Sequence, residues 1–126
     1  MANFLVADDA RIMRMNLGKM LTELGHNITA EAKDGSDAIN LYKRHQDEID
    51  IITMDITMPC VNDIEDGIMA AKEIIKINPT AKIVMVTSHN DQRKVLDAIK
   101  SGATNYLVKP ISKIKLEEVI NKIKIK

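Results

Sequence analysis

Five polar side chains end or directly follow short apolar runs of the sequence: Asp8, Asp9, Asp55, Thr87 and Lys109. Runs of this length, rich in isoleucine and valine, are typical of strands that are buried on both faces of a sheet. At the carboxyl edge of an open parallel sheet, side chains leave the packed interior and face a ligand crevice. If the strands are neighbours, the five groups converge on one crevice.

Three carboxylates in one crevice would repel one another by roughly 3 kcal/mol per pair at about 5 Å and an effective dielectric of about 20. A cation would relieve this repulsion, and oxygen-only ligands favour a hard ion such as Mg²⁺ that retains several waters. Asp55 could then attack phosphorus and form an acyl phosphate. Lys109 could neutralise one phosphoryl oxygen, and Thr87 could donate a hydrogen bond to another. The same crowding predicts that Asp9→Asn raises the melting temperature without Mg²⁺ and weakens metal binding.

Strand-like and helix-like segments alternate along the whole chain. The strands are predicted at residues 4–7, 28–32, 49–55, 82–86 and 105–108, and the helices begin at Ala10, Ser36 (as a cap), Gly67, near Val95 and at Ser112. Short connections between such segments specify a parallel sheet with right-handed crossovers. We therefore predict an α/β, flavodoxin-like (βα)5 fold, with strand order 2-1-3-4-5 and helices on both faces.

Length and composition describe one domain over residues 1–126, with no output domain expected. The chain is 45% hydrophobic and 29% charged, and no apolar run approaches the roughly 20 residues that cross a bilayer. The start lacks the pattern of a secretory signal, and the single Cys60 forms no internal disulfide, so we expect a cytoplasmic protein. The zero formal net charge argues against a nucleic-acid partner, and membrane association is not expected either.

Taken together, these motifs resemble a response-regulator receiver domain, of the single-domain chemotaxis (CheY-like) type. The resemblance covers essentially the whole length and rests on Asp8-Asp9, the stretch Met54–Pro59, Thr87-Ser88, Tyr106 and Lys109-Pro110. It implies that Asp55 accepts phosphate from a histidine kinase. It further implies that Asp9, Asp55 and the carbonyl group of Thr57 ligate Mg²⁺, whereas Asp8 acts through water.

The resemblance also implies a switch. Thr87 is expected to move and bond the phosphoryl group, and Tyr106 to swing inward into the vacated space. Lys109 is expected to pair with the phosphate, and its peptide bond to Pro110 to be cis. Without the resemblance, Tyr106 would be interpreted as a half-buried strand tyrosine and His89 as an exposed loop histidine.

The segment after Pro59 departs from the family pattern. Receivers usually continue with Gly, an apolar residue, Asp or Asn, and then Gly, but here about four extra residues stand in the 60–66 loop. The loop adds acidic side chains, namely Asp63, Glu65 and Asp66. We predict that it alters partner choice or phosphate lifetime without abolishing phosphorylation.

The function predicted from these residues is two-component signal transduction, in which phosphorylation of Asp55 switches a partner-binding surface. Such a protein is not an enzyme for external substrates, and its target would be a protein such as a flagellar motor switch component. An alternative is a phosphorelay intermediate that passes phosphate to a histidine phosphotransfer protein. A Mg²⁺-dependent aspartyl-phosphate phosphatase is a further alternative, but such enzymes place a second acid where this chain has Thr57. A docking module with an inert site is disfavoured by the full acidic set.

Overall fold

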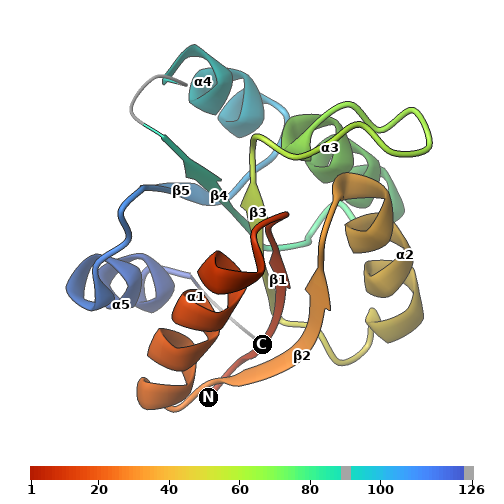
Figure 1. Ribbon diagram of the computed structural model, residues 1–126. Coiled ribbons are helices and arrows are strands. Elements are labelled where there is room, and N and C mark those ends of the chain that lie inside the picture. The colour runs from red at the N-terminus through yellow and green to blue at the C-terminus, as the bar shows by residue number, and fades with distance from the viewer. Residues whose placement is uncertain (89–91, 124–126) are drawn as a thin grey trace.

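The computed structural model describes residues 1–88 and 92–123, and within them five strands alternate with five helices (Figure 1). The strands are β1 (Asn3–Ala7), β2 (Asn27–Ala32), β3 (Ile51–Asp55), β4 (Ile83–Thr87) and β5 (Asn105–Val108). The helices are α1 (Arg11–Glu23), α2 (Gly35–His45), α3 (Gly67–Ile77), α4 (Gln92–Lys100) and α5 (Lys113–Asn121). Each predicted segment is present, and its observed ends lie within about three residues of the predicted ones.

The strands form one parallel sheet in the order β2-β1-β3-β4-β5. This order confirms the predicted flavodoxin-like fold class. The central strands β1 and β3 are paired in register from Phe4↔Ile51 to Ala7↔Met54, so their carboxyl ends lie next to each other.

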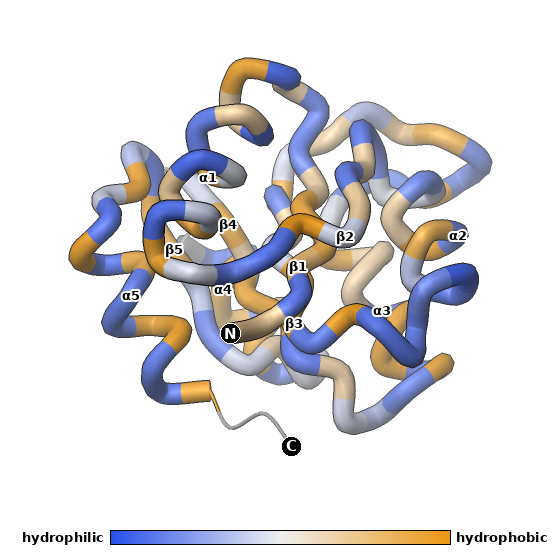
Figure 2. The backbone as a smooth tube through the Cα atoms, turned by 90° about the horizontal axis from the view of Figure 1, so that it is seen from below, coloured by the Kyte–Doolittle hydropathy of each residue, from blue (hydrophilic) through white to orange (hydrophobic). Residues whose placement is uncertain are grey.

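Two hydrophobic cores lie on opposite faces of the sheet. Successive residues of a strand point to opposite faces, and β1 shows this directly: Phe4 and Val6 belong to one core, and Leu5 and Ala7 to the other. Figure 1 shows α1 and α5 over one face, and α2 and α3 over the other. In Figure 2 hydrophobic and hydrophilic segments alternate along the helices, as expected when each buries one stripe.

Aspartate and serine side chains cap three of the helices. Ser112 caps α5 as predicted, because its Oγ accepts a hydrogen bond from the Lys115 N–H at 3.1 Å. The predicted cap of α2 was wrong: Asp34, not Ser36, accepts the hydrogen bond, from the Asp37 N–H at 2.7 Å. Ser36 lies inside the first turn of α2, and its hydroxyl accepts a hydrogen bond from the Asn62 side chain instead.

Among the described residues, the Thr53 hydroxyl is buried without a hydrogen-bond partner. Thr53 lies in the middle of β3 and is 1% exposed. An unsatisfied buried hydroxyl costs about 1–3 kcal/mol, so Thr53→Val should raise the free energy of unfolding by about 1 kcal/mol. Urea unfolding measures this gain. Thr104→Val is the matched contrast, because Thr104 Oγ1 accepts the Ile83 N–H at 3.2 Å and its loss should destabilise the fold. A loss of stability in both variants would contradict the prediction.

No helix in the described part of the chain is long and apolar enough to span a membrane.

Candidate functional site

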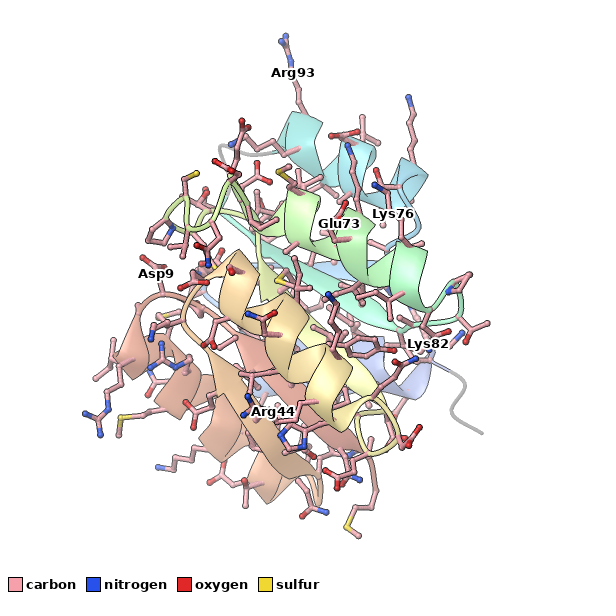
Figure 3. The ribbon with its side chains drawn as sticks, turned by 90° about the vertical axis from the view of Figure 1, so that its right-hand side faces the viewer. Asp9, Arg44, Glu73, Lys76, Lys82 and Arg93 are labelled. Atoms are coloured by element: carbon pink, nitrogen blue, oxygen red, sulfur yellow. The ribbon has the colours of Figure 1, made fainter. Side chains whose placement is uncertain are left out.

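Three carboxylates meet at the carboxyl edge of the sheet. Asp8 and Asp9 follow β1, and Asp55 is the last residue of the neighbouring strand β3. One oxygen from each of the three carboxylates lies within 4.8 Å of the others. Asp8 and Asp55 are buried, whereas Asp9 is exposed. Figure 3 shows Asp9 at this edge and Lys82, which precedes β4, at the opposite end of the sheet.

Lys109 brings a positive charge to the two buried carboxylates. Its Nζ lies 3.2 Å from Asp8 Oδ2 and 3.1 Å from Asp55 Oδ2. The backbone holds Lys109 in place, because its N–H donates to the Thr87 carbonyl at 2.8 Å and so ties the end of β5 to the end of β4. The peptide bond from Lys109 to Pro110 is cis, as predicted. The sequence prediction therefore correctly brought together residues that are up to 101 positions apart.

The pKa of the Asp55 carboxyl group is well above that of an ordinary aspartate. Burial raises the pKa of Asp55 to about 6, and the nearby Asp8 carboxylate adds to the rise. The ammonium of Lys109 and the backbone N–H of Thr57 oppose it. For Lys109 the balance is reversed: burial lowers its pKa, but attraction to Asp55 and Asp8 outweighs burial and raises the pKa above its ordinary value. Lys109 is therefore charged throughout the physiological range.

The raised pKa of Asp55 predicts a pH-dependent stability difference in the absence of metal. Below about pH 4 the carboxyl group is protonated in both the folded and the unfolded chain and has no effect. Between about pH 4 and 6 the folded chain holds a proton that the unfolded chain has released, so this group lowers stability as pH rises. Above about pH 6 the cost is complete, at about 3 kcal/mol.

Asp55→Asn removes this cost, because an amide carries no charge. In EDTA at pH 8 we expect the variant to melt at a higher temperature than the unchanged chain, and the difference to vanish towards pH 4. Thermal unfolding of both proteins across this pH range measures the effect. A constant difference in melting temperature would contradict it. Since Asp9 is exposed, we expect Asp9→Asn to give a smaller gain than the sequence analysis supposed.

Among the described residues, neither Thr87 nor Tyr106 forms a hydrogen bond or ion pair with the carboxylates of the acidic cluster. Thr87 ends β4 and is 1% exposed, and its hydroxyl donates to the Ser88 carbonyl at 3.0 Å. Tyr106, on β5, is 44% exposed. Both line a hollow of about 630 Å³ between β4, β5 and α4, together with Val95, Leu96, Ile99, Lys100 and Val108. The movements of Thr87 and Tyr106 stay predictions, and His89 lies outside the described residues.

The loop between β3 and α3 contains a tight turn that the sequence analysis treated as irregular. Val61 and Ile64 exchange two backbone hydrogen bonds, of 3.3 and 3.0 Å, across Asn62 and Asp63. The φ angles of Asn62 and Asp63 are 52° and 66°, which are the conformations of a type I′ turn. The sequence signal was weak, because Asn and Asp tolerate the left-handed conformation of a type I′ turn but the usual glycine of such turns is missing here.

This turn is anchored on the start of α2. Asn62 Nδ2 donates to Ser36 Oγ at 2.9 Å. Ile64 packs closely against Gly35, where a Cβ atom would lie 2.6 Å from Ile64 Cγ2. The extra residues therefore form an ordered structure on the surface beside the acidic cluster.

Gly67 allows α3 to begin directly against the end of β3. Its N–H donates to the Ile56 carbonyl at 2.8 Å, and a Cβ atom at this position would lie only 1.9 Å from the Asp55 carbonyl oxygen. Asp66 caps the helix, with its Oδ1 accepting the Met69 N–H at 2.9 Å. Any side chain at position 67 would therefore displace either α3 or Asp55.

The donor set of the cluster fits a hard divalent cation. Asp8, Asp9 and Asp55 offer carboxylate oxygens, which are the ligands that Mg²⁺ prefers. Thr57 lies two residues beyond Asp55, and the role of its carbonyl group as a ligand stays a prediction.

Comparison with known proteins identifies the family. A sequence model of the response regulator receiver domain matches residues 4–121. This chain belongs to the response regulator receiver family. The receiver is 43% identical to the chemotaxis protein CheY of Thermotoga maritima over 119 residues, which cover 94% of each chain. It is 42% identical to the chemotaxis protein CheY of Bacillus subtilis over 118 residues, with 94% of this chain and 93% of that protein covered.

Solved structures support the same assignment for the fold. The receiver superimposes on a chain of the CheX–CheY–BeF3–Mg complex from Borrelia burgdorferi with a TM-score of 0.88 and 32% identity, covering 98% of this chain and 90% of that one. These relatives place the receiver in two-component signalling, among chemotaxis proteins.

Proposed function

We propose that this receiver is a phosphorylation-activated chemotaxis regulator, with Asp55 as the phospho-acceptor. The observation that carries the proposal is the contact of Lys109 with both Asp55 and Asp8 beside the exposed Asp9. A structural ion pair would need one acid for one base, but here Lys109 contacts two acids, and an oxygen of a third carboxylate, Asp9, lies within 4.8 Å of oxygens of both. Two CheY proteins among the relatives, matched over nearly their full length, support the assignment to chemotaxis.

In the proposed reaction, an Asp55 carboxylate oxygen attacks the phosphorus atom of a phosphohistidine on the kinase. The new O–P bond forms as the P–N bond breaks, and the leaving imidazole takes up a proton. Bound Mg²⁺, held by Asp9 and Asp55 with Asp8 nearby, would offset the negative charge of the incoming phosphoryl group. Lys109 then moves from its two carboxylate partners to a phosphoryl oxygen, which keeps its charge paired.

The proposed output surface surrounds Tyr106. Leu96, Ile99 and Tyr106 are 64%, 40% and 44% exposed and line the same hollow as the buried Thr87. A shift of the Thr87 hydroxyl from the Ser88 carbonyl to a phosphoryl oxygen would change the wall of this hollow. Phosphorylation would thereby change which partner binds, through a shift between two conformations.

The proposal is tested with acetyl phosphate as a small phosphoryl donor. We expect intact mass spectrometry to find one added phosphoryl group with Mg²⁺ and almost none with EDTA. The phosphorylated protein should then capture a flagellar motor switch component. Capture of a histidine phosphotransfer protein instead would favour the phosphorelay alternative, and turnover of added phosphate esters would favour the phosphatase. Absence of phosphoryl uptake with Mg²⁺ would contradict the proposal.

The anchored turn offers a further prediction. Deleting residues 61–64 leaves Pro59, two residues, Asp66 and Gly67, which is the usual family spacing. Because Val61 and Ile64 pair across the turn, the cut ends are close together. We expect the deletion to keep phosphoryl uptake but to change the rate of kinase transfer or of phosphate loss by about threefold or more. Asp63→Gly is the control, since Asn-Gly keeps the turn and removes one charge. Unchanged rates in the deletion variant would refute this role.

A further inference from the structure

Arg14, in the first turn and a half of α1, makes two contacts near the acidic cluster. Its Nη1 donates to the backbone carbonyl of Asp8 at 2.7 Å, and its Nε lies 3.1 Å from Glu31 Oε1 on β2. The Arg14 side chain is only 15% exposed. It therefore links the loop that carries Asp8 and Asp9 to the edge strand of the sheet. Sequence analysis did not single out this residue, because an arginine on a surface helix gives no such signal.

The contact with the Asp8 carbonyl fixes the peptide that leads into Asp9. The Asp8 carbonyl and the Asp9 N–H belong to one planar peptide group. Holding the carbonyl therefore fixes the orientation of that peptide and the position of the Asp9 Cα atom. The Asp8 N–H donates to the Ala32 carbonyl at 3.0 Å, and the Asp8 carboxylate accepts the Ala10 N–H at 2.9 Å. Within the described residues, no hydrogen bond or ion pair holds the Asp9 side chain itself. The placement of Asp9 thus depends on its backbone.

The start of α1 lacks the support that other helices have. Side chains of Asp34, Asp66 and Ser112 cap α2, α3 and α5, but Ala10 at the start of α1 provides no side-chain cap. Arg14 replaces this support with a bond from the helix back to the loop. A guanidinium group can serve both partners at once because its donors have a fixed planar arrangement, which a lysine ammonium lacks.

We propose that Arg14 is a positioning residue for the magnesium site: it holds the Asp8–Asp9 peptide through its bond to the Asp8 carbonyl, and Glu31 orients its guanidinium group. The inference rests on the proposed function, in which Asp9 ligates Mg²⁺. Arg14 acts through the backbone and does not touch the ion. Residues that orient metal ligands in this way commonly contribute 10-fold or more to metal affinity.

The direction of the effect separates positioning from simple electrostatics. Removing a positive charge close to an acidic cluster should strengthen Mg²⁺ binding if only charge matters. Positioning by Arg14 predicts the opposite. Isothermal titration of the unphosphorylated full chain with MgCl₂ should therefore show about 10-fold weaker binding for Arg14→Met. Arg11→Met is the charge control, because Arg11 is an exposed arginine of the same helix and its replacement removes the same charge; we expect its Mg²⁺ binding to be unchanged or tighter.

Two variants of Glu31 test the same link without altering Arg14. Glu31→Ala should weaken Mg²⁺ binding about threefold, whereas Glu31→Gln, whose amide oxygen can still accept from Arg14 Nε, should restore it. Glu31 is half exposed, so both proteins should fold. Melting curves in EDTA report any general loss of stability. Unchanged or tighter Mg²⁺ binding in Arg14→Met or in Glu31→Ala would overturn the inference, whatever their stability. Failure of the unchanged chain to bind Mg²⁺ would instead count against the proposed function.

Discussion

Asp55→Asn is expected to reduce phosphoryl uptake from acetyl phosphate by roughly 1,000-fold or more, because a carboxamide cannot replace the carboxylate nucleophile. The variant should remain folded, since asparagine has nearly the shape of aspartate and relieves the repulsion between positions 55 and 8. Intact mass measured against time gives the rate for each protein. The expected result is one phosphoryl group on the unchanged chain and none on the variant.

Asp63→Asn is the matched control for this experiment. Asp63 is an exposed acid in the loop that follows β3, and it lies in the turn across which Val61 and Ile64 pair. We expect it to take up phosphoryl at the normal rate. If Asp55→Asn gains a phosphoryl group as fast as the control, the acceptor is another residue and the proposed mechanism is wrong. Peptide mapping of the phosphorylated protein would then identify the residue.

Gly67→Ala is expected to be the most damaging small substitution at the site. The added Cβ would lie 1.9 Å from the carbonyl oxygen of Asp55, and backbone atoms cannot move aside as a flexible side chain can. Overpacking of this kind costs about 3 kcal/mol, and the displaced strand end should also slow phosphoryl uptake. Urea unfolding and the acetyl phosphate assay measure the two effects separately.

Gly18→Ala provides the comparison, since it makes the same chemical change inside α1. A Cβ at Gly18 has ordinary contact with Ile28, at 3.8 Å, and alanine has a higher helix propensity than glycine. This variant should be about 0.5–1 kcal/mol more stable and take up phosphoryl normally. Equal stability of the two variants would show that the close approach at Gly67 is not a real constraint.

Much of the fold and of the site geometry could be predicted, because the apolar runs mark the strands and the site residues lie where those strands end. Once the order of the strands is known, residues such as Asp8, Asp55 and Lys109 must lie at one edge, whatever their separation in the sequence. The alternation of apolar runs and helical spacing predicts a parallel sheet, and the order 2-1-3-4-5 comes from the flavodoxin-like fold. The family comparisons agree with this prediction.

The charge balance of the site could not be predicted in the same way. The sequence presents Asp8, Asp9 and Asp55 as equivalent acids, and their mutual repulsion was assumed to be shared. In the structure Asp9 is exposed, and the single charge of Lys109 is shared between the two buried acids. The pKa of Asp55 is raised by burial first and by the Asp8 carboxylate second. The burial of each acid depends on how the loops pack in the folded protein, and the identity of the neighbouring residues in the sequence does not predict it.

Local geometry also decided the details that sequence analysis missed. Asp34 and Ser36 are both good capping residues, and the choice between them depends on where the helix begins. The bond from Arg14 to a backbone carbonyl has no pattern of residue types behind it.

The scarcity of aromatic side chains gives this protein a simple optical property. It has no tryptophan and two tyrosines, of which Tyr42 is 2% exposed and accepts a hydrogen bond from Asn78, while Tyr106 is 44% exposed. In Tyr42→Phe, ultraviolet emission would therefore come almost entirely from Tyr106. The protein would then report the surroundings of that ring in real time, without any attached dye.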